Sequence, residues 1–382
     1  MDALNWYENE GVVKKAASRF LAVAPAASPE DRSEAVRRLA AHVAADDLKR
    51  ADLTATICGS LVEKGADPAP LEEPLLERFV PALRQLAEQV AQEPIATAEV
   101  PAEDPAQIII EQPEQTETGV RNGKPMKRPG LLRTLWRLAV ASRKLRRAMR
   151  EQQRLAAARP VSEVEATVNA LGGGAIAMFS ASPALRTAHP EVRDLARALS
   201  GRVDCCGWLD SVFEVLEDEP LLVIEPSTER GILARLSGVD VNFTLTMLLM
   251  HGFPGEDGKP HSRLSEKAAS VLRGDAQQVC EQVTGVWNLY NWPAIDERGG
   301  LPPGQANSKH WIWNEGKPAD IAVFEGRRVV LLGPPAYTRT WQAERTFAAM
   351  RPQLRIEKVL TPDEVRGWLA KMIAARPGNP QV

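Results

Sequence analysis

The stretch Asn307–Pro335, NSKHWIWNEGKPADIAVFEGRRVVLLGPP, decides the fold of the C-terminal part of this 382-residue chain. Ile321–Phe324 and Val329–Leu332 are short apolar runs on either side of residues 325–327, Glu-Gly-Arg. That spacing predicts a tight β-hairpin. Gly333 and the two prolines that follow end the second run. No other stretch of the C-terminal part is as rich in strand-forming residues, so its strands are expected to organise the sheet.

The segments around this hairpin predict a mixed-sheet α/β domain over residues 219–382. The expected strands are Pro220–Glu225, Ile232–Leu236, Val283–Tyr290 and Leu354–Val359, and the expected helices are Asn242–His251, Ser265–Arg273, Thr340–Met350 and a last one opening at Thr361. Thr361-Pro362-Asp363-Glu364 combines an N-cap, proline at the first helical position and glutamate at the third. The order strand–helix–strand–helix at the end of the chain implies two parallel strands, and the hairpin makes the sheet mixed.

The N-terminal residues 1–92 predict a helical bundle. Ser28 with the Pro-Glu-Asp that follows is a typical helix start. A helix is expected at Leu53–Lys64 with Asp52 as its N-cap, and another at Leu75–Val90 with a kink or break at Pro81. Helical periodicity returns after residue 160, where the triple glycine of residues 172–174 is expected to break a helix. The fold class is therefore a multidomain α+β or α/β protein.

Residues 93–126 predict a linker rich in acids and prolines. Residues 93–118 hold seven acidic residues, four prolines and no Lys or Arg. Such a composition buries too little apolar surface to offset the entropy of ordering. Ile108–Ile110 is the apolar exception. It is either a local apolar cluster or a linear motif that a partner binds as an added strand.

Residues 127–159 reverse the charge, with eleven Lys and Arg residues against the single acid Glu151. Apolar residues recur in steps of three and four, which predicts an amphipathic helix joined to a helical segment that ends near residue 218. The residues proposed to contact a partner here are Arg133, Trp136, Arg137, Arg143, Arg146 and Arg147. Three interpretations stay open: a solvated face of a docked helix, a helix that binds a protein or an anionic membrane surface, and phosphate contact with nucleic acid.

The totals exclude several classes of protein. The formal net charge of −3 gives no overall attraction to nucleic acid or anionic membranes. The longest apolar run, Thr244–Met250, is far shorter than a transmembrane helix requires, and no secretory signal opens the chain. None of the four cysteines stands in C-x-x-C spacing, so neither zinc nor a disulfide framework is expected. We therefore expect a cytoplasmic protein without metal or cofactor, and its content of Ala, Arg and Pro is typical of GC-rich bacterial genomes.

Aromatic residues concentrate in the C-terminal part, where six of the nine tryptophans fall between residues 287 and 368. Trp292, Trp311 and Trp313 are candidate partner-binding residues, although such density is also typical of a core. His310, Glu315 and Asp320 are the best acid–base trio by proximity. No motif places a nucleophile beside them, so no catalytic residue is assigned and the trio remains an alternative.

The run His310–Pro335 together with Leu354–Trp368 resembles the C-terminal part of bacterial accessory proteins from multi-gene systems built around a MoxR-type ATPase and a von Willebrand A protein. The resemblance covers about the last 160 residues and supplies no catalytic residues. It implies a non-catalytic accessory role in an ATPase-containing assembly.

These observations predict an adaptor that acts by protein–protein interaction, through the basic helix or the tryptophan-rich region. The first alternative is an enzyme with an aromatic-lined pocket around His310. The second is a nucleic-acid-binding protein that uses residues 127–159. An enzyme requires His310 to converge with an acid in a pocket, whereas an adaptor requires exposed apolar surface.

Overall fold

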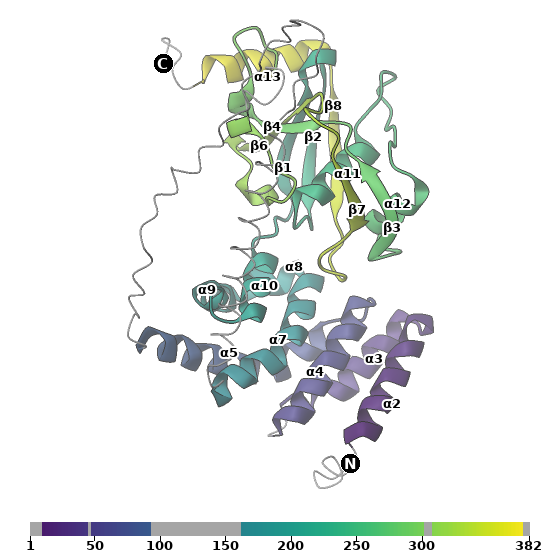
Figure 1. The fold of residues 1–382 in the computed structure, drawn as a ribbon, viewed down its shortest axis with the longest axis vertical. Coiled ribbons are helices and arrows are strands. Elements are labelled where there is room, and N and C mark those ends of the chain that lie inside the picture. Colours follow the sequence, from purple (N-terminus) through teal and green to yellow (C-terminus); the bar gives the residue numbers. More distant parts are fainter. Residues whose placement is uncertain (1–9, 45–46, 93–161, 302–307, 377–382) are drawn as a thin grey trace, which may run out of the picture. The chain divides into compact units, whose positions relative to one another are not determined.

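The computed structural model describes residues 10–44, 47–92, 162–301 and 308–376. The described residues up to 87 and from 164 onward belong to one compact unit. This unit contains a helical part followed by a sheet part (Figure 1). The expected fold class, a multidomain α+β protein with a mixed C-terminal sheet, is confirmed. The linker, the basic helix and their named residues lie outside the described residues.

Eight α-helices make up the described helical part. They are α2 (Glu10–Val23), α3 (Pro29–Ala40), α4 (Leu48–Glu63), α5 (Ala69–Gln92), α7 (Glu163–Ala181), α8 (Pro183–Ala188), α9 (Pro190–Leu199) and α10 (Asp204–Phe213). Ser28 caps α3 as expected, because its Oγ accepts a hydrogen bond from the backbone N–H of Asp31 at 3.0 Å. Helix α4 begins earlier than expected. Its N-cap is Asp47 and not Asp52, since the added turn buries Ala51 completely.

The expected break at Pro81 is absent, because α5 runs through both Pro74 and Pro81. Interior prolines cost a helix a backbone hydrogen bond and a steric clash. The apolar face of α5 offsets this cost, since Leu75, Phe79 and Leu83 are fully buried. Tertiary packing therefore decides the length of this helix against its local sequence.

The triple glycine does not break a helix either, since α7 continues through residues 172–174. These glycines allow close packing. A Cβ on Gly174 would lie 3.0 Å from Leu75 Cδ1 of α5 and 3.1 Å from the carbonyl oxygen of Ala55 in α4. Gly59 of α4 faces it, because a Cβ there would lie 3.3 Å from the Cα of Gly174. The expected break was wrong because α7 is set against α4 and α5 at near-backbone contact.

The sheet part is built from eight strands in two sheets. They are β1 (Glu219–Glu225), β2 (Arg230–Ser237), β3 (Gln278–Thr284), β4 (Asn288–Asn291), β5 (Val323–Phe324), β6 (Arg327–Gly333), β7 (Thr340–Glu344) and β8 (Gln353–Leu360). The larger sheet has the order β4-β6-β1-β2-β8, with β5 also pairing with β6. Only the β1–β6 pair is parallel, so the sheet is mixed. The smaller sheet is the antiparallel pair β3–β7.

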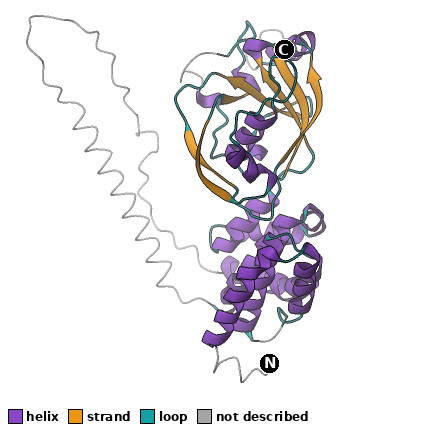
Figure 2. Ribbon diagram, turned by 90° about the vertical axis from the view of Figure 1, so that its right-hand side faces the viewer, coloured by secondary structure: helices purple, strands orange, loops and turns teal. Residues whose placement is uncertain are grey.

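Alternating residues of β1 face two different cores, as the two-residue period of a strand requires. Leu221 and Val223 pack with residues of α11 (Asn242–Gly252) and α12 (Glu266–Arg273), a core that β3 and β7 also enter. Leu222 and Ile224 pack with residues of α13 (Pro362–Ala374). Figure 2 shows helices (purple) between the two sets of strands (orange). The larger sheet is thus covered on both faces.

Local turn and cap chemistry in the sheet part is confirmed. The β5–β6 hairpin turns at Glu325 and Gly326 with φ of 46° and 74°, the left-handed pair that a two-residue hairpin turn needs. Thr361 and Glu364 form the expected capping box at the start of α13.

Two expectations for the sheet part were wrong. The segment from Thr340 is strand β7 and not a helix, because alternate residues Trp341 and Ala343 face inward and the chain pairs with β3. The single strand expected at Val283–Tyr290 is divided into β3 and β4, which end in different sheets. Both predictions failed because the strands that pair with these segments lie far away in the sequence.

Candidate interaction surface

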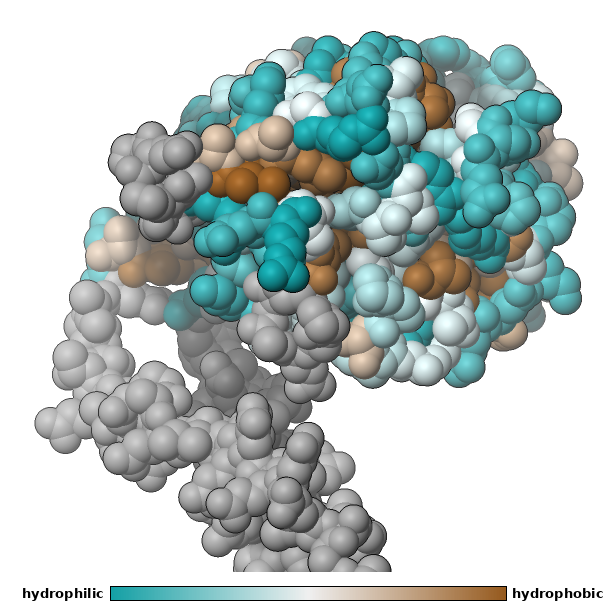
Figure 3. Space-filling model, turned by 90° about the horizontal axis from the view of Figure 1, so that it is seen from above, coloured by the Kyte–Doolittle hydropathy of each residue, from teal (hydrophilic) through white to brown (hydrophobic). Residues whose placement is uncertain are grey.

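Exposed large hydrophobic side chains mark candidate interaction surfaces where they adjoin one another. Figure 3 shows one face on which hydrophobic residues (brown) form patches separated by hydrophilic ones. Two groups of exposed residues stand out by position. One lies on α2, and the other comprises Trp313 and Tyr337, which keep 49% and 45% of their surface exposed.

The loop that carries Trp311 and Trp313 is fixed against the sheet. The backbone N–H of Ile312 donates to the carbonyl of Leu289 in β4 at 2.9 Å, and Trp311 forms an isolated bridge with Tyr290. Because the chain is extended here, the two indoles lie on one side and Ile312 enters the core on the other. Their ring centroids are 5.2 Å apart.

The same loop is also held by the first turn of α11. Asn242 donates from its backbone N–H to Gly316 at 2.9 Å and from Nδ2 to the carbonyl of Trp313 at 2.8 Å. Phe243 donates its N–H to the carbonyl of Asn314 at 3.0 Å. These bonds satisfy donors that a helix N-terminus otherwise leaves open. They fix the backbone on which the exposed indole of Trp313 stands.

The loop between β6 and β7 contributes Tyr337 and Arg339 to the same surface. The ring of Tyr337 lies 6.2 Å from that of Trp311, and the guanidinium carbon of Arg339 lies 5.1 Å from the centroid of Tyr337. We call Trp311, Trp313, Tyr337 and Arg339 the aromatic–arginine patch. Two loops separated by strands β5 and β6 are needed to build it.

Arg339 is held by neutral acceptors. Its Nη1 donates to Asn314 Oδ1 at 2.6 Å, and its Nη2 donates to Asn288 Oδ1 at 3.2 Å and to the hydroxyl of Tyr337 at 3.0 Å. Asn288 and Asn314 are almost fully buried, which keeps these bonds away from water. Among the residues that the structure describes, no carboxylate forms an ion pair with Arg339. Its positive charge is therefore fixed in place without a counter-charge.

A small cavity of about 130 Å³ adjoins the patch. Asn242, Trp311, Trp313, Lys317 and Asp320 are among the residues that line it. Pockets for small-molecule ligands have volumes of about 300–1,000 Å³. The cavity therefore accommodates a side chain of a partner better than a substrate.

The candidate acid–base trio is not brought together. Burial lowers the pKa of His310, and Lys309 and Arg376 lower it further, with no acid among the causes. Glu315 is exposed, and Asp320 accepts a hydrogen bond from the backbone N–H of Lys317 at 3.3 Å. No hydrogen bond or ion pair joins His310 to either acid within the described residues. His310 therefore has neither acid of the trio beside it to support a role as general base.

The structure places the other candidate residues elsewhere. The ring of Trp292 packs on that of Phe324, with centroids 5.1 Å apart, and Phe324 packs in turn on Trp368 of α13 at 6.5 Å. Within the described ranges, no ring contact joins Trp292 to the patch. The candidate residues between 127 and 159 lie outside the described residues. Sequence reasoning missed Tyr337 and Arg339, which no motif singles out.

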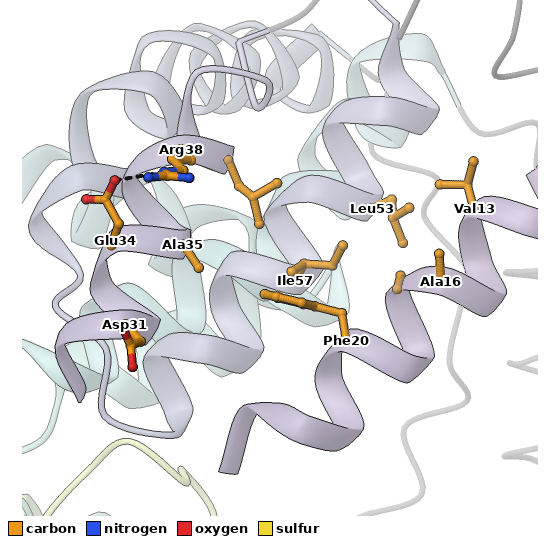
Figure 4. Close-up of a pocket in the computed structure, with 11 residues that line it drawn as sticks. Val13, Ala16, Phe20, Asp31, Glu34, Ala35, Arg38, Leu53 and Ile57 are labelled. Atoms are coloured by element: carbon orange, nitrogen blue, oxygen red, sulfur yellow. Dashed lines mark hydrogen bonds and ion pairs between the residues drawn. The ribbon is translucent and has the colours of Figure 1, made fainter. Parts of the chain in front are cut away.

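An apolar groove of about 600 Å³ lies between α2, α3 and α4. Phe20 reaches from α2 toward Ile57 of α4, with Ala35 of α3 beyond it (Figure 4). Phe20 is 40% exposed. The groove's carboxylates are already engaged, since Glu34 binds Arg38 and Asp31 accepts from the hydroxyl of Ser28. The surface of the groove that stays available to a partner is mainly apolar.

Comparisons with protein-family models, curated proteins and solved structures returned no match. The resemblance to accessory proteins of MoxR-type systems therefore stays a prediction. Within the described ranges, no helix is both long and apolar enough to cross a membrane. The same part of the chain holds no group of three or more His, Cys, Asp and Glu residues able to bind a metal ion.

Proposed function

We propose that this protein is an adaptor that binds another protein through the aromatic–arginine patch. The observation that carries the proposal is the meeting of the exposed Trp313 and Tyr337 with the immobilised guanidinium of Arg339 on one surface. Trp, Tyr and Arg are the residue types that dominate binding energy at protein interfaces. Immobilising side chains on binding costs free energy and lowers affinity. This cost is reduced here because the side chains are already held in place in the free protein.

The proposal extends to the setting of the protein. A cytoplasmic bacterial adaptor would join its partner to a larger assembly, and the resemblance described above implies one that contains an ATPase. Contacts of residues 127–159 with protein, nucleic acid or an anionic membrane surface stay predictions beside it. The patch supports the binding role without depending on them.

Trp313→Ala is expected to reduce capture of the partner at least about thirtyfold, because a central interface tryptophan typically contributes 2 kcal/mol or more. The full-length protein and its variants would be used to capture partners from extract of the source cells, with quantification by mass spectrometry. Trp208→Ala is the matched control, since Trp208 is 51% exposed but lies on α10. Its capture should equal that of the unsubstituted protein.

The unfolding midpoints of both variants would be measured first, so that loss of capture is not loss of folding. A partner retained by Trp313→Ala would contradict the proposal. Equal loss from both tryptophan variants would contradict it as well, because the binding would then not be specific to the patch.

A further inference from the structure

We infer that the aromatic–arginine patch recognises an acidic peptide segment of the partner, in which an Asp or Glu side chain stands beside an apolar residue. This inference rests on the proposed function and names the chemistry of the ligand. The carboxylate would meet Arg339 and the hydroxyl of Tyr337. The apolar residue would lie against the indole of Trp313.

The charge of Arg339 is not balanced by a carboxylate among the described residues. A guanidinium stays protonated in proteins and has five N–H donors, of which its three hydrogen bonds use three. All three acceptors are neutral. Elsewhere in the sheet part, Arg230 and Arg328 each pair with a carboxylate. Arg339 thus keeps both charge and donors for a ligand.

A comparison with Arg345 separates a binding role from a structural one. Arg345 also forms no ion pair with a carboxylate of the described residues, although Asp240 lies near enough to offset part of the lowering of its pKa by burial. It is only 6% exposed and donates to the carbonyls of Ala348, Met350 and Ala276. It therefore ties the chain together from inside. Arg339 is only partly buried and borders two exposed aromatic rings.

The hydroxyl of Tyr337 offers a hydrogen-bond donor beside Arg339. Its oxygen accepts a hydrogen bond from Arg339 Nη2 at 3.0 Å, so its own proton is available to a further acceptor. An ionised carboxylate accepts hydrogen bonds and donates none. Donor and charge therefore converge on the same kind of group, and charge-assisted bonds of this type are the stronger ones.

The charges around Arg339 favour a carboxylate over a phosphate as the ligand. Sites for phosphate typically combine several cationic donors. Here Lys317, which lines the adjoining cavity, already pairs with Glu214. The groups that face Arg339 from the neighbouring loop and from β4 are the amides of Asn314 and Asn288. One guanidinium and one phenol match a singly charged anion.

The indole of Trp313 offers a contact for an apolar side chain of the ligand. Trp313 is 49% exposed and its ring lies beside that of Trp311, which is buried. A half-exposed indole offers apolar area at low entropic cost. A peptide with an acid and a neighbouring apolar side chain satisfies both parts of the patch.

The test uses random 12-residue peptides displayed on phage, selected against the folded full-length protein. The selected peptides would be synthesised with each Asp or Glu kept or changed to Asn or Gln. Affinities would be measured by fluorescence anisotropy for the unsubstituted protein and for Arg339→Gln, Tyr337→Phe and Trp313→Ala. Gln removes the charge of residue 339 but keeps a polar N–H donor, and Phe keeps the ring of residue 337, so both variants are conservative.

We expect removal of the peptide carboxylate to weaken binding about tenfold or more in the unsubstituted protein, and less than twofold in Arg339→Gln. Tyr337→Phe should show a smaller loss that also disappears with the neutral peptide. Peptides that require Trp313 but no carboxylate would overturn this inference and leave the proposed function standing. Selection of no peptide that depends on Trp313 would overturn both.

Discussion

Replacing Gly172 with valine is expected to lower the free energy of unfolding by about 3 kcal/mol, near the upper end for overpacked interiors. A Cβ at this position would lie 2.6 Å from both Cβ and Sγ of Cys205 in α10. Sγ can rotate away, but Cβ is bonded to the backbone of α10 and moves only with that helix. The substitution therefore forces α7 and α10 apart.

Gly173 is the matched control, because a Cβ there meets nothing within 4 Å. Gly173→Ala should raise stability by about 0.5–1 kcal/mol, since alanine favours a helix over glycine by that amount. Urea unfolding followed by circular dichroism measures both changes. A loss of stability in Gly173→Ala as large as that in Gly172→Val would contradict the close packing of α7.

Glu225→Ala is expected to destabilise the protein by about 3–5 kcal/mol, the cost of removing one partner of a buried ion pair. Glu225 is only 9% exposed and pairs with Arg230. It also accepts hydrogen bonds from Thr228 Oγ1 at 2.6 Å and Trp287 Nε1 at 2.9 Å. The alanine removes the acceptor that these donors share, and the indole N–H of the buried Trp287 loses its hydrogen bond. Glu256→Ala, in an exposed loop, should leave the unfolding midpoint unchanged.

The same carboxylate predicts a pH dependence of stability. Burial raises the pKa of Glu225, but the hydrogen bonds from Thr228, Trp287 and Arg230 outweigh it and hold the pKa below its usual 4.5. The folded state therefore binds this proton more weakly than the unfolded state. Its stabilisation is present above pH 4.5 and is lost as the pH falls below that value. Glu225→Gln should remove this part of the acid dependence, and an unchanged profile would contradict the account.

Features that depend on neighbours in the sequence could be predicted. The turn at residues 325–326 and the capping box of α13 are specified by backbone preference and by side chains three residues apart. Strand β1 follows from its short continuous apolar run, and the buried face of α5 follows from its helical periodicity. These elements needed no knowledge of the rest of the chain.

Features that depend on partners far away in the sequence could not be predicted from the sequence. The glycines of α7 signal a break locally, whereas Leu75 and Ala55 make them a packing surface. Residues 340–344 become a strand because β3 pairs with them. The aromatic–arginine patch could be predicted only in part. The density of tryptophans indicated Trp311 and Trp313, but Arg339 joins them only through the fold. Its acceptors Asn288 and Asn314 come from β4 and from the tryptophan loop.

Site-specific photo-crosslinking tests the binding role of the patch most directly. p-Benzoyl-phenylalanine would replace Thr338, an exposed residue between Tyr337 and Arg339, and in a control chain it would replace the exposed Thr56 of α4. After irradiation in the source cells, adducts would be identified by mass spectrometry. The account predicts one protein crosslinked from position 338, absent from position 56 and lost when Trp313→Ala is added. No adduct at position 338, or the same adducts at both positions, would contradict it.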